Sequence, residues 1–140
     1  MKIAYTIARI LLGLMFFVFG LNGFLFFIPA PASIPGPAGP FSQAMLVSHY
    51  TWFVSGVQVI TGILLLTNQY VPFAIVTLAA VLANILVFHL TMLPMGFPLA
   101  IVTTVLWFVV AWPLRAHFAP LFVRRADVNV PPSRGRENAP

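Results

Sequence analysis

Long apolar segments dominate the chain, and short breaks rich in proline or polar residues separate them. Residues 10 to 114 contain no Asp, Glu, Lys or Arg. A helix needs about 20 apolar residues to cross the hydrocarbon core of a bilayer. Four segments reach that length, which predicts an all-α membrane protein built as a four-transmembrane-helix bundle. The predicted helices cover about residues 5–28, 44–66, 71–93 and 98–117.

Prolines mark the joints between these helices. Five of them lie in the first loop, between residues 29 and 40. Asn68 precedes Pro72 at the second joint, and residues 94–98 read Pro-Met-Gly-Phe-Pro at the third. Pro113 falls in the last turn of the fourth helix, where its ring and its missing N–H are expected to kink or end that helix.

The composition excludes a water-soluble domain and most enzyme chemistry. Hydrophobic residues make up 61% of the chain and charged residues 6%, whereas soluble domains carry about 25% charged residues. The chain has no cysteine, so disulfides and thiolate metal sites are excluded. Its only acidic residues are Asp127 and Glu137, which leaves no intramembrane carboxylate for acid–base catalysis or metal binding. The sequence therefore predicts no catalytic residue and no metal site.

The basic residues predict how the chain crosses the membrane. All seven flank the apolar segments, and none lies in an internal loop. Cytoplasmic flanks are enriched in Lys and Arg, and four spans return the C-terminus to the side of the N-terminus. We therefore expect both termini to be cytoplasmic, in the inner membrane of a bacterium or archaeon. The basic flanks would contact anionic lipid headgroups, not nucleic acid, and Arg9 would extend its side chain to the membrane surface.

The two ends of the chain carry further signals. Lys2 and Arg9, an apolar stretch and Ala30-Pro31-Ala32 resemble a cleaved signal peptide, but the stretch exceeds the usual length of about 7–15 residues. The first helix is therefore expected to be retained, and residues 1–120 to form one four-helix transmembrane domain. Residues 121–140 form a polar, basic segment without periodicity. This predicts a cytoplasmic tail that is either disordered or bound to a partner.

Polar and small residues recur along one face of the second predicted helix. Their spacings of three and four residues place them in a single stripe. The stripe comprises Ser48, Thr51, Ser55, Gln58 and Gly62. The third helix repeats the pattern with Thr77, Ala80, Asn84 and Thr91, and Gly13 and Gly20 lie seven residues apart on the first.

The favoured interpretation of this stripe is helix–helix packing. Small residues let two backbones approach closely, and amide side chains form hydrogen bonds across the interface. We expect Gln58 to lie level with Gly13 and to bond to a neighbouring helix. The alternative is a polar cavity that binds a quinone headgroup or another small molecule.

Three further polar residues share a depth near the outer ends of the first three helices: Asn22, His49 and His89. Thr103 and Thr104 lie at a similar level in the fourth helix. Histidine donors and an amide can bind a quinone carbonyl, and a pair of histidines can ligate haem. Histidines that reach for lipid headgroups are the commoner arrangement. A plain interfacial role is therefore the favoured interpretation, and a quinone site formed by the three residues is the alternative.

Six short motifs, in their order and spacing, resemble the DoxX family of small integral membrane proteins. They are residues 9–14, 19–24, 27–31, 62–66, 84–90 and 94–98. The resemblance covers about residues 3–122. It implies a four-helix bundle that is linked, by association, to thiosulfate-to-quinone electron transfer and to membrane complexes that handle redox stress. Relatives commonly carry a charge where this chain has Gly23, Gln58 and Leu93, so chemistry that needs an intramembrane charge is not expected here.

Two functions are compatible with these observations. The first is a non-catalytic accessory subunit of a larger membrane complex of the redox or electron-transfer kind, which requires no cofactor. The alternative is a quinone-binding subunit of a thiosulfate:quinone-type oxidoreductase. Both require other membrane-protein subunits as partners. A small-molecule carrier is disfavoured, because four short spans without an intramembrane charge lack a group that could couple transport to an ion gradient.

Overall fold

The computed structural model describes residues 2–29, 31 and 33–125, and every regular element in these ranges is helical. Five helices make up most of the chain: α1 (Lys2–Leu25), α2 (Ala38–Val47), α3 (Tyr50–Leu66), α4 (Val71–Thr91) and α5 (Phe97–Ala111). A short α6 (Arg115–Phe118) and three 3-10 turns follow or connect them, at Pro94–Gly96, Trp112–Leu114 and Ala119–Phe122.

Three segments are long and apolar enough to cross a membrane: Lys2–Leu25, Val71–Thr91 and Pro94–Phe122. A fourth crossing is present if α2 and α3, which are bent by 86° relative to each other, count as one span. Such helices indicate a multi-pass membrane protein, since an apolar surface of this extent is stable only in lipid or against other apolar protein.

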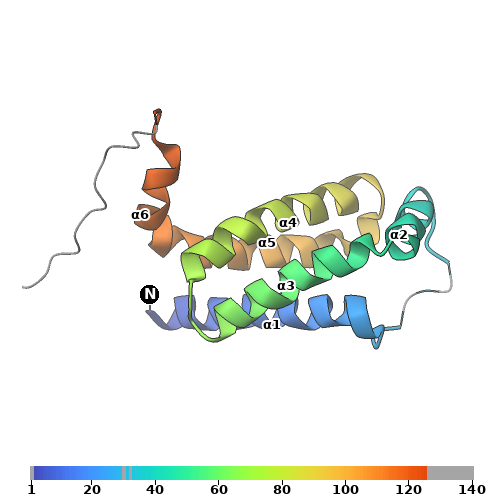
Figure 1. The fold of residues 1–140 in the computed structure, drawn as a ribbon, viewed down its shortest axis with the longest axis horizontal. Coiled ribbons are helices and arrows are strands. Elements are labelled where there is room, and N and C mark those ends of the chain that lie inside the picture. Colours follow the sequence, from blue (N-terminus) through green and yellow to red (C-terminus); the bar gives the residue numbers. More distant parts are fainter. Residues whose placement is uncertain (1, 30, 32, 126–140) are drawn as a thin grey trace, which may run out of the picture.

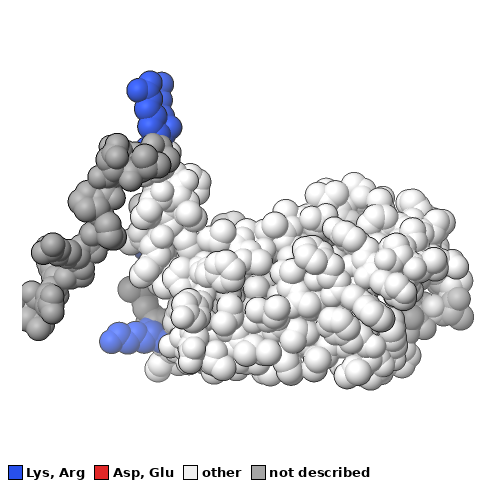
Figure 2. Space-filling view, viewed as in Figure 1, with Lys and Arg blue, Asp and Glu red and all other residues white. Residues whose placement is uncertain are grey.

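The four long helices, α1, α3, α4 and α5, lie side by side (Figure 1). α1 packs against α3 and α5, and α4 packs against the same two helices. Lys2 and α6 lie at the same end of this arrangement, which we call the basic end because the Lys and Arg side chains of the visible face gather there (Figure 2). We call the opposite end, where α2 lies, the α2 end.

The densest packing lies toward the basic end. Leu12, Leu65, Ile75, Leu78 and Val110 are fully buried there and come from all four long helices. Trp107 on α5 adds a bond between helices, donating from Nε1 to the Ile75 carbonyl on α4 at 2.9 Å. In lipid, apolar helices gain little from hydrophobic burial, so close van der Waals packing and such bonds hold them together.

The closest helix pair, α1 and α3, meets along glycines. A Cβ atom added at Gly62 would lie 2.7 Å from the backbone nitrogen of Phe17, and one at Gly20 would lie 2.9 Å from that of Val59. A Cβ at Gly23 would overlap the hydroxyl of Ser55. These positions therefore require glycine, because any side chain would push the two backbones apart.

The prediction of one continuous helix over residues 44–66 is wrong. The chain breaks at Ser48 and His49, and His49 adopts a left-handed conformation with φ of 59°. The Ser48 hydroxyl donates to the carbonyl of Met45 at 3.3 Å, and such local bonds compete with helix continuation. Part of the predicted proline-rich loop is helical instead, since Pro40 lies in the first turn of α2, where proline is tolerated.

The predicted fourth helix, 98–117, also ends early. α5 stops at Ala111, two residues before Pro113, and this confirms the expectation that Pro113 kinks or ends the helix. The chain then turns away from the long axis of the other helices into α6 (Figure 1). The predicted tail continues beyond residue 125, outside the described residues.

Candidate functional site

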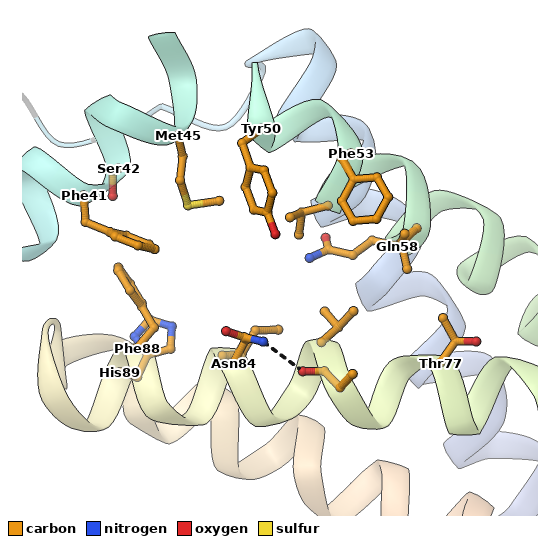
Figure 3. A pocket seen from close by; sticks show the side chains of 15 residues that line it. Phe41, Ser42, Met45, Tyr50, Phe53, Gln58, Thr77, Asn84, Phe88 and His89 are labelled. Carbon is orange, nitrogen blue, oxygen red and sulfur yellow. Dashed lines mark hydrogen bonds between the residues drawn. The ribbon is translucent and has the colours of Figure 1, made fainter. Parts of the chain in front are cut away.

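A cavity of about 500 Å³ opens between α3 and α4 at the α2 end (Figure 3). Its walls are mainly apolar, and Phe41 of α2 and Phe88 of α4 meet at one side with their ring centroids 5.7 Å apart. Six polar side chains also line it: Ser42, Tyr50, Gln58, Thr77, Asn84 and His89. Apolar walls with a few polar groups are typical of sites for small molecules.

The bend at His49 accounts for much of this cavity. It directs α2 away from the axis of α3, so that Phe41, Ser42 and Met45 form a side of the space that α3 and α4 leave between them (Figure 3). A straight helix over the same residues would leave this side open. The cavity therefore follows from the break that the apolar pattern did not predict.

Two polar residues of α4 are bonded to their own helix. Thr77 donates its hydroxyl hydrogen to the Phe73 carbonyl at 3.0 Å. Asn84 donates from Nδ2 to the Ala80 carbonyl at 3.3 Å (Figure 3). A carbonyl can only accept, so the nitrogen of the Asn84 amide, not its oxygen, faces Ala80.

His89 is held by the turn that follows α4. Its Nδ1 lies 3.0 Å from the Leu93 carbonyl, so Nδ1 carries a hydrogen and donates it. Gly96 packs directly against the imidazole, and a Cβ atom at that position would overlap the ring. The ring orientation is thus fixed from two sides, and in the neutral ring Nε2 is left as an acceptor.

A second cavity of about 230 Å³ lies deeper, among α1, α3, α4 and α5. Gln58, Ile85 and His89 line both cavities and separate them. Thr103 lines the deeper one and bonds to the Leu99 carbonyl of its own helix at 2.8 Å. His89 and Gln58 are therefore the two polar residues common to both spaces.

Gln58 faces these cavities, but its predicted partners are wrong. Its Cβ packs against Gly20, whereas Gly13 lies against Leu65, Leu66 and Gly62. Within the described residues, the Gln58 amide forms no hydrogen bond to another helix. Its polar atoms are instead directed toward the space that Tyr50 and Asn84 also face (Figure 3).

The rest of the predicted stripe divides between packing and the helix break. Ser55 lies beside Gly23, and Gly62 beside Gly13 and Phe17, all in the α1–α3 contact. Thr51 also lies near Gly23. Ser48 does not belong to this face, because it sits in the break between α2 and α3.

The predicted outer level does not form one site. Asn22 accepts a hydrogen bond at Oδ1 from the backbone N–H of Ile28 at 2.7 Å, which secures the chain where it leaves α1. His49 is exposed and stacks on Trp52, with ring centroids 4.6 Å apart. Neither residue lines either cavity. Only His89 of the three reaches the candidate site.

Sequence reasoning missed two groups. Ser42 and Tyr50 lie outside the stripe, and they join the cavity only because the chain bends between them. Arg9 is 8% exposed and bonds to the end of α3 rather than extending to the membrane surface. In the part of the chain that the structure describes, no three His, Cys, Asp or Glu side chains gather as a metal site would require.

No family model, curated protein or solved structure matches this chain.

Proposed function

We propose that this protein binds a lipid-soluble molecule with a polar ring, of the quinone and hydroquinone class, in the cavity between α3 and α4. The observation that carries the proposal is the cavity itself. Its volume of about 500 Å³ falls in the range of roughly 300–1,000 Å³ that is usual for small-molecule sites. Aromatic rings and polar groups from three helices converge on it, which suits a flat ring with oxygen substituents.

The site supports binding rather than catalysis by this chain alone. Residues 1 to 126 contain no Asp or Glu, so the residues that line the cavity offer no carboxylate for acid–base chemistry. A quinone bound there would exchange electrons with another protein. We therefore place the chain as a ligand-binding subunit of a larger redox complex, in agreement with its resemblance to DoxX proteins.

The cellular setting is part of the same proposal. The basic end would face the cytoplasm of a bacterium or archaeon, where Lys and Arg are enriched, with anionic headgroups around it. The cavity would then lie in the outer half of the inner membrane. A lipid-soluble ligand could enter it from the bilayer without crossing water.

A second candidate is a purely structural accessory subunit. The α1–α3 contact favours it, because Ser55, Gly62 and the glycines of α1 are used in packing rather than in a site. In that case the cavity would hold lipid chains and no specific ligand.

Ligand-dependent stabilisation separates the two candidates. The full chain in nanodiscs would be titrated with a short-chain hydroquinone under reducing, anaerobic conditions, and its thermal unfolding followed. A specific ligand stabilises the folded state by about 2.7 kcal/mol at 100 times its Kd. We expect the wild type to be stabilised and Gln58→Leu to respond much less. Thr91→Val serves as a control, because Thr91 lies on α4 outside both cavities. No stabilisation of the wild type would favour the structural subunit.

A further inference from the structure

On the α4 side of the cavity most side-chain hydrogens are bonded to backbone carbonyls, and one hydrogen of the Asn84 amide stays free. Thr77 donates its hydroxyl hydrogen to the Phe73 carbonyl, and His89 donates its Nδ1 hydrogen to the Leu93 carbonyl. Asn84 uses one of its two amide hydrogens on Ala80. The atoms left over are mostly acceptors: the lone pairs of Thr77 Oγ1, the Oδ1 of Asn84 and the Nε2 of neutral His89.

The direction of each of these bonds follows from its partner. Each partner is a backbone carbonyl, and a carbonyl has no hydrogen to give. The Asn84 amide cannot be flipped without placing two oxygens together, and Nδ1 of His89 cannot be the acceptor toward Leu93. The acceptor character of this wall is therefore built into the helix and the turn that follows it.

The opposite wall is adaptable. Tyr50 and Ser42 carry hydroxyls that rotate, and the Gln58 amide offers both a donor and an acceptor end. Such groups adjust to a ligand oxygen of either kind. The α4 wall therefore determines whether a donor or an acceptor is preferred on the ligand, and the opposite wall can bond to either.

We propose that the cavity selects ligands whose ring carries a hydroxyl hydrogen, such as phenols and hydroquinones, over ligands with only carbonyl or ether oxygens. This inference rests on the proposed function, since it specifies the form of the ligand that the same cavity holds. A ring hydroxyl donates to the acceptors of α4 and accepts from Gln58 or Tyr50. A quinone carbonyl or an ether oxygen at the same place can accept only the one free hydrogen of Asn84, and it leaves the remaining α4 acceptors without a donor.

The test compares a para-alkylphenol with its methyl ether of equal alkyl chain. The two share shape and lipid solubility, and neither changes redox state during the measurement. Binding to the full chain in nanodiscs is measured by ligand-dependent thermal stabilisation. The phenol hydroxyl forms one hydrogen bond that the ether cannot form, and it pairs one α4 acceptor. Together these effects raise the affinity about tenfold. We expect the phenol to bind about ten times more tightly than the ether.

Three variants locate the effect. Asn84→Leu and Thr77→Val each remove an acceptor and should bring the phenol-to-ether ratio toward one, mainly by weakening the phenol. Thr91→Val removes the same chemical group from α4 outside both cavities, where Thr91 donates to Val87, and should leave the ratio unchanged. Thr77→Val is nearly isosteric, so its folding is not expected to suffer.

The outcomes are distinguishable. If both compounds stabilise the wild type equally and Gln58→Leu weakens both, the cavity binds ligands without selecting a donor, and this inference is overturned while the proposed function stands. If neither compound nor a hydroquinone stabilises the wild type, the proposed function itself fails. If the ratio is high but survives Asn84→Leu and Thr77→Val together, the α4 wall is not its source and the inference is wrong.

Discussion

The guanidinium of Arg9 on α1 donates from Nη1 to the backbone carbonyl of Leu65 at the end of α3. The same nitrogen lies 3.3 Å from the Leu66 carbonyl. The last carbonyls of a helix lack partners within it and carry the negative end of the helix dipole. A buried cation at this point therefore ties α1 to α3, although Arg9 Nε has no partner in the described residues.

Arg9→Leu should destabilise the fold. It leaves carbonyls at the end of α3 without their cation, and losing a charged donor to a buried acceptor costs about 1–3 kcal/mol. Unfolding in mild detergent, followed by tryptophan fluorescence, measures the change. Arg115→Leu is the matched control, because Arg115 is exposed and bonds only locally to the Trp112 carbonyl and the Trp112 ring. Equal effects of the two substitutions would contradict the assigned role of Arg9.

Two glycines of α3 should respond in opposite ways to alanine. At Gly62 the added methyl meets the backbone of Phe17 at 2.7 Å, so Gly62→Ala must separate α1 from α3. At Gly56 the methyl meets nothing within 4 Å, so Gly56→Ala is neutral or mildly stabilising through helix propensity. We expect Gly62→Ala to lose about 1–3 kcal/mol, as overpacking does. Thermal unfolding of both variants in one detergent provides the comparison, and a neutral Gly62→Ala would refute the close contact.

The sequence allowed part of this architecture to be predicted, for a physical reason. Spacings of three and four residues identify a helix face, so the pairing of Gly62 and Ser55 with a small-residue face of another helix could be anticipated. The break at Ser48 and His49 was not predicted, because long apolar segments lie on both sides of it and neither glycine nor proline marks it. The cavity depends on that break, so the cavity could not be predicted from the sequence either.

The candidate residues show the same limit. Depth along a helix can be counted from the sequence, and this count is what grouped Asn22, His49 and His89. Direction around the helix and local bonding decide their roles, and those depend on turns. The carbonyl of Leu93 and the absence of a side chain at Gly96 place His89 at the cavity, while the turn at Phe26 engages Asn22 elsewhere.

The predicted orientation can be tested with single cysteines, since the natural chain has none. Ser33 lies in the loop at the α2 end, and Ser133 lies in the tail, outside the described residues. We expect an impermeant thiol reagent to label Ser33→Cys in intact cells and to label Ser133→Cys only after the cells are opened. The reverse pattern would place the basic end outside.

Residues 112–125 should lie along the membrane surface at the basic end. The segment turns away from the long helices (Figure 1) and exposes Leu121, Phe122 and Val123 beside Arg124 and Arg125. Apolar side chains flanked by arginines bind at the boundary between headgroups and acyl chains, about 5–10 Å deep. A nitroxide on Phe122→Cys should therefore contact the acyl region, whereas one on Arg124→Cys should report water.

Anionic lipid should strengthen this immersion, because each basic residue near an anionic surface contributes about 1 kcal/mol. Changing Arg124 and Arg125 to Gln should make the depth of the label at position 122 shallower in vesicles that contain phosphatidylglycerol, and should have less effect in purely zwitterionic vesicles. A nitroxide on Gln69→Cys is the control, since Gln69 is exposed in the loop between α3 and α4 at the same end. If labels at 122 and 69 are equally accessible to aqueous reagents in both lipids, the segment does not bind the membrane surface. Its exposed apolar residues would then have to be covered by a partner protein.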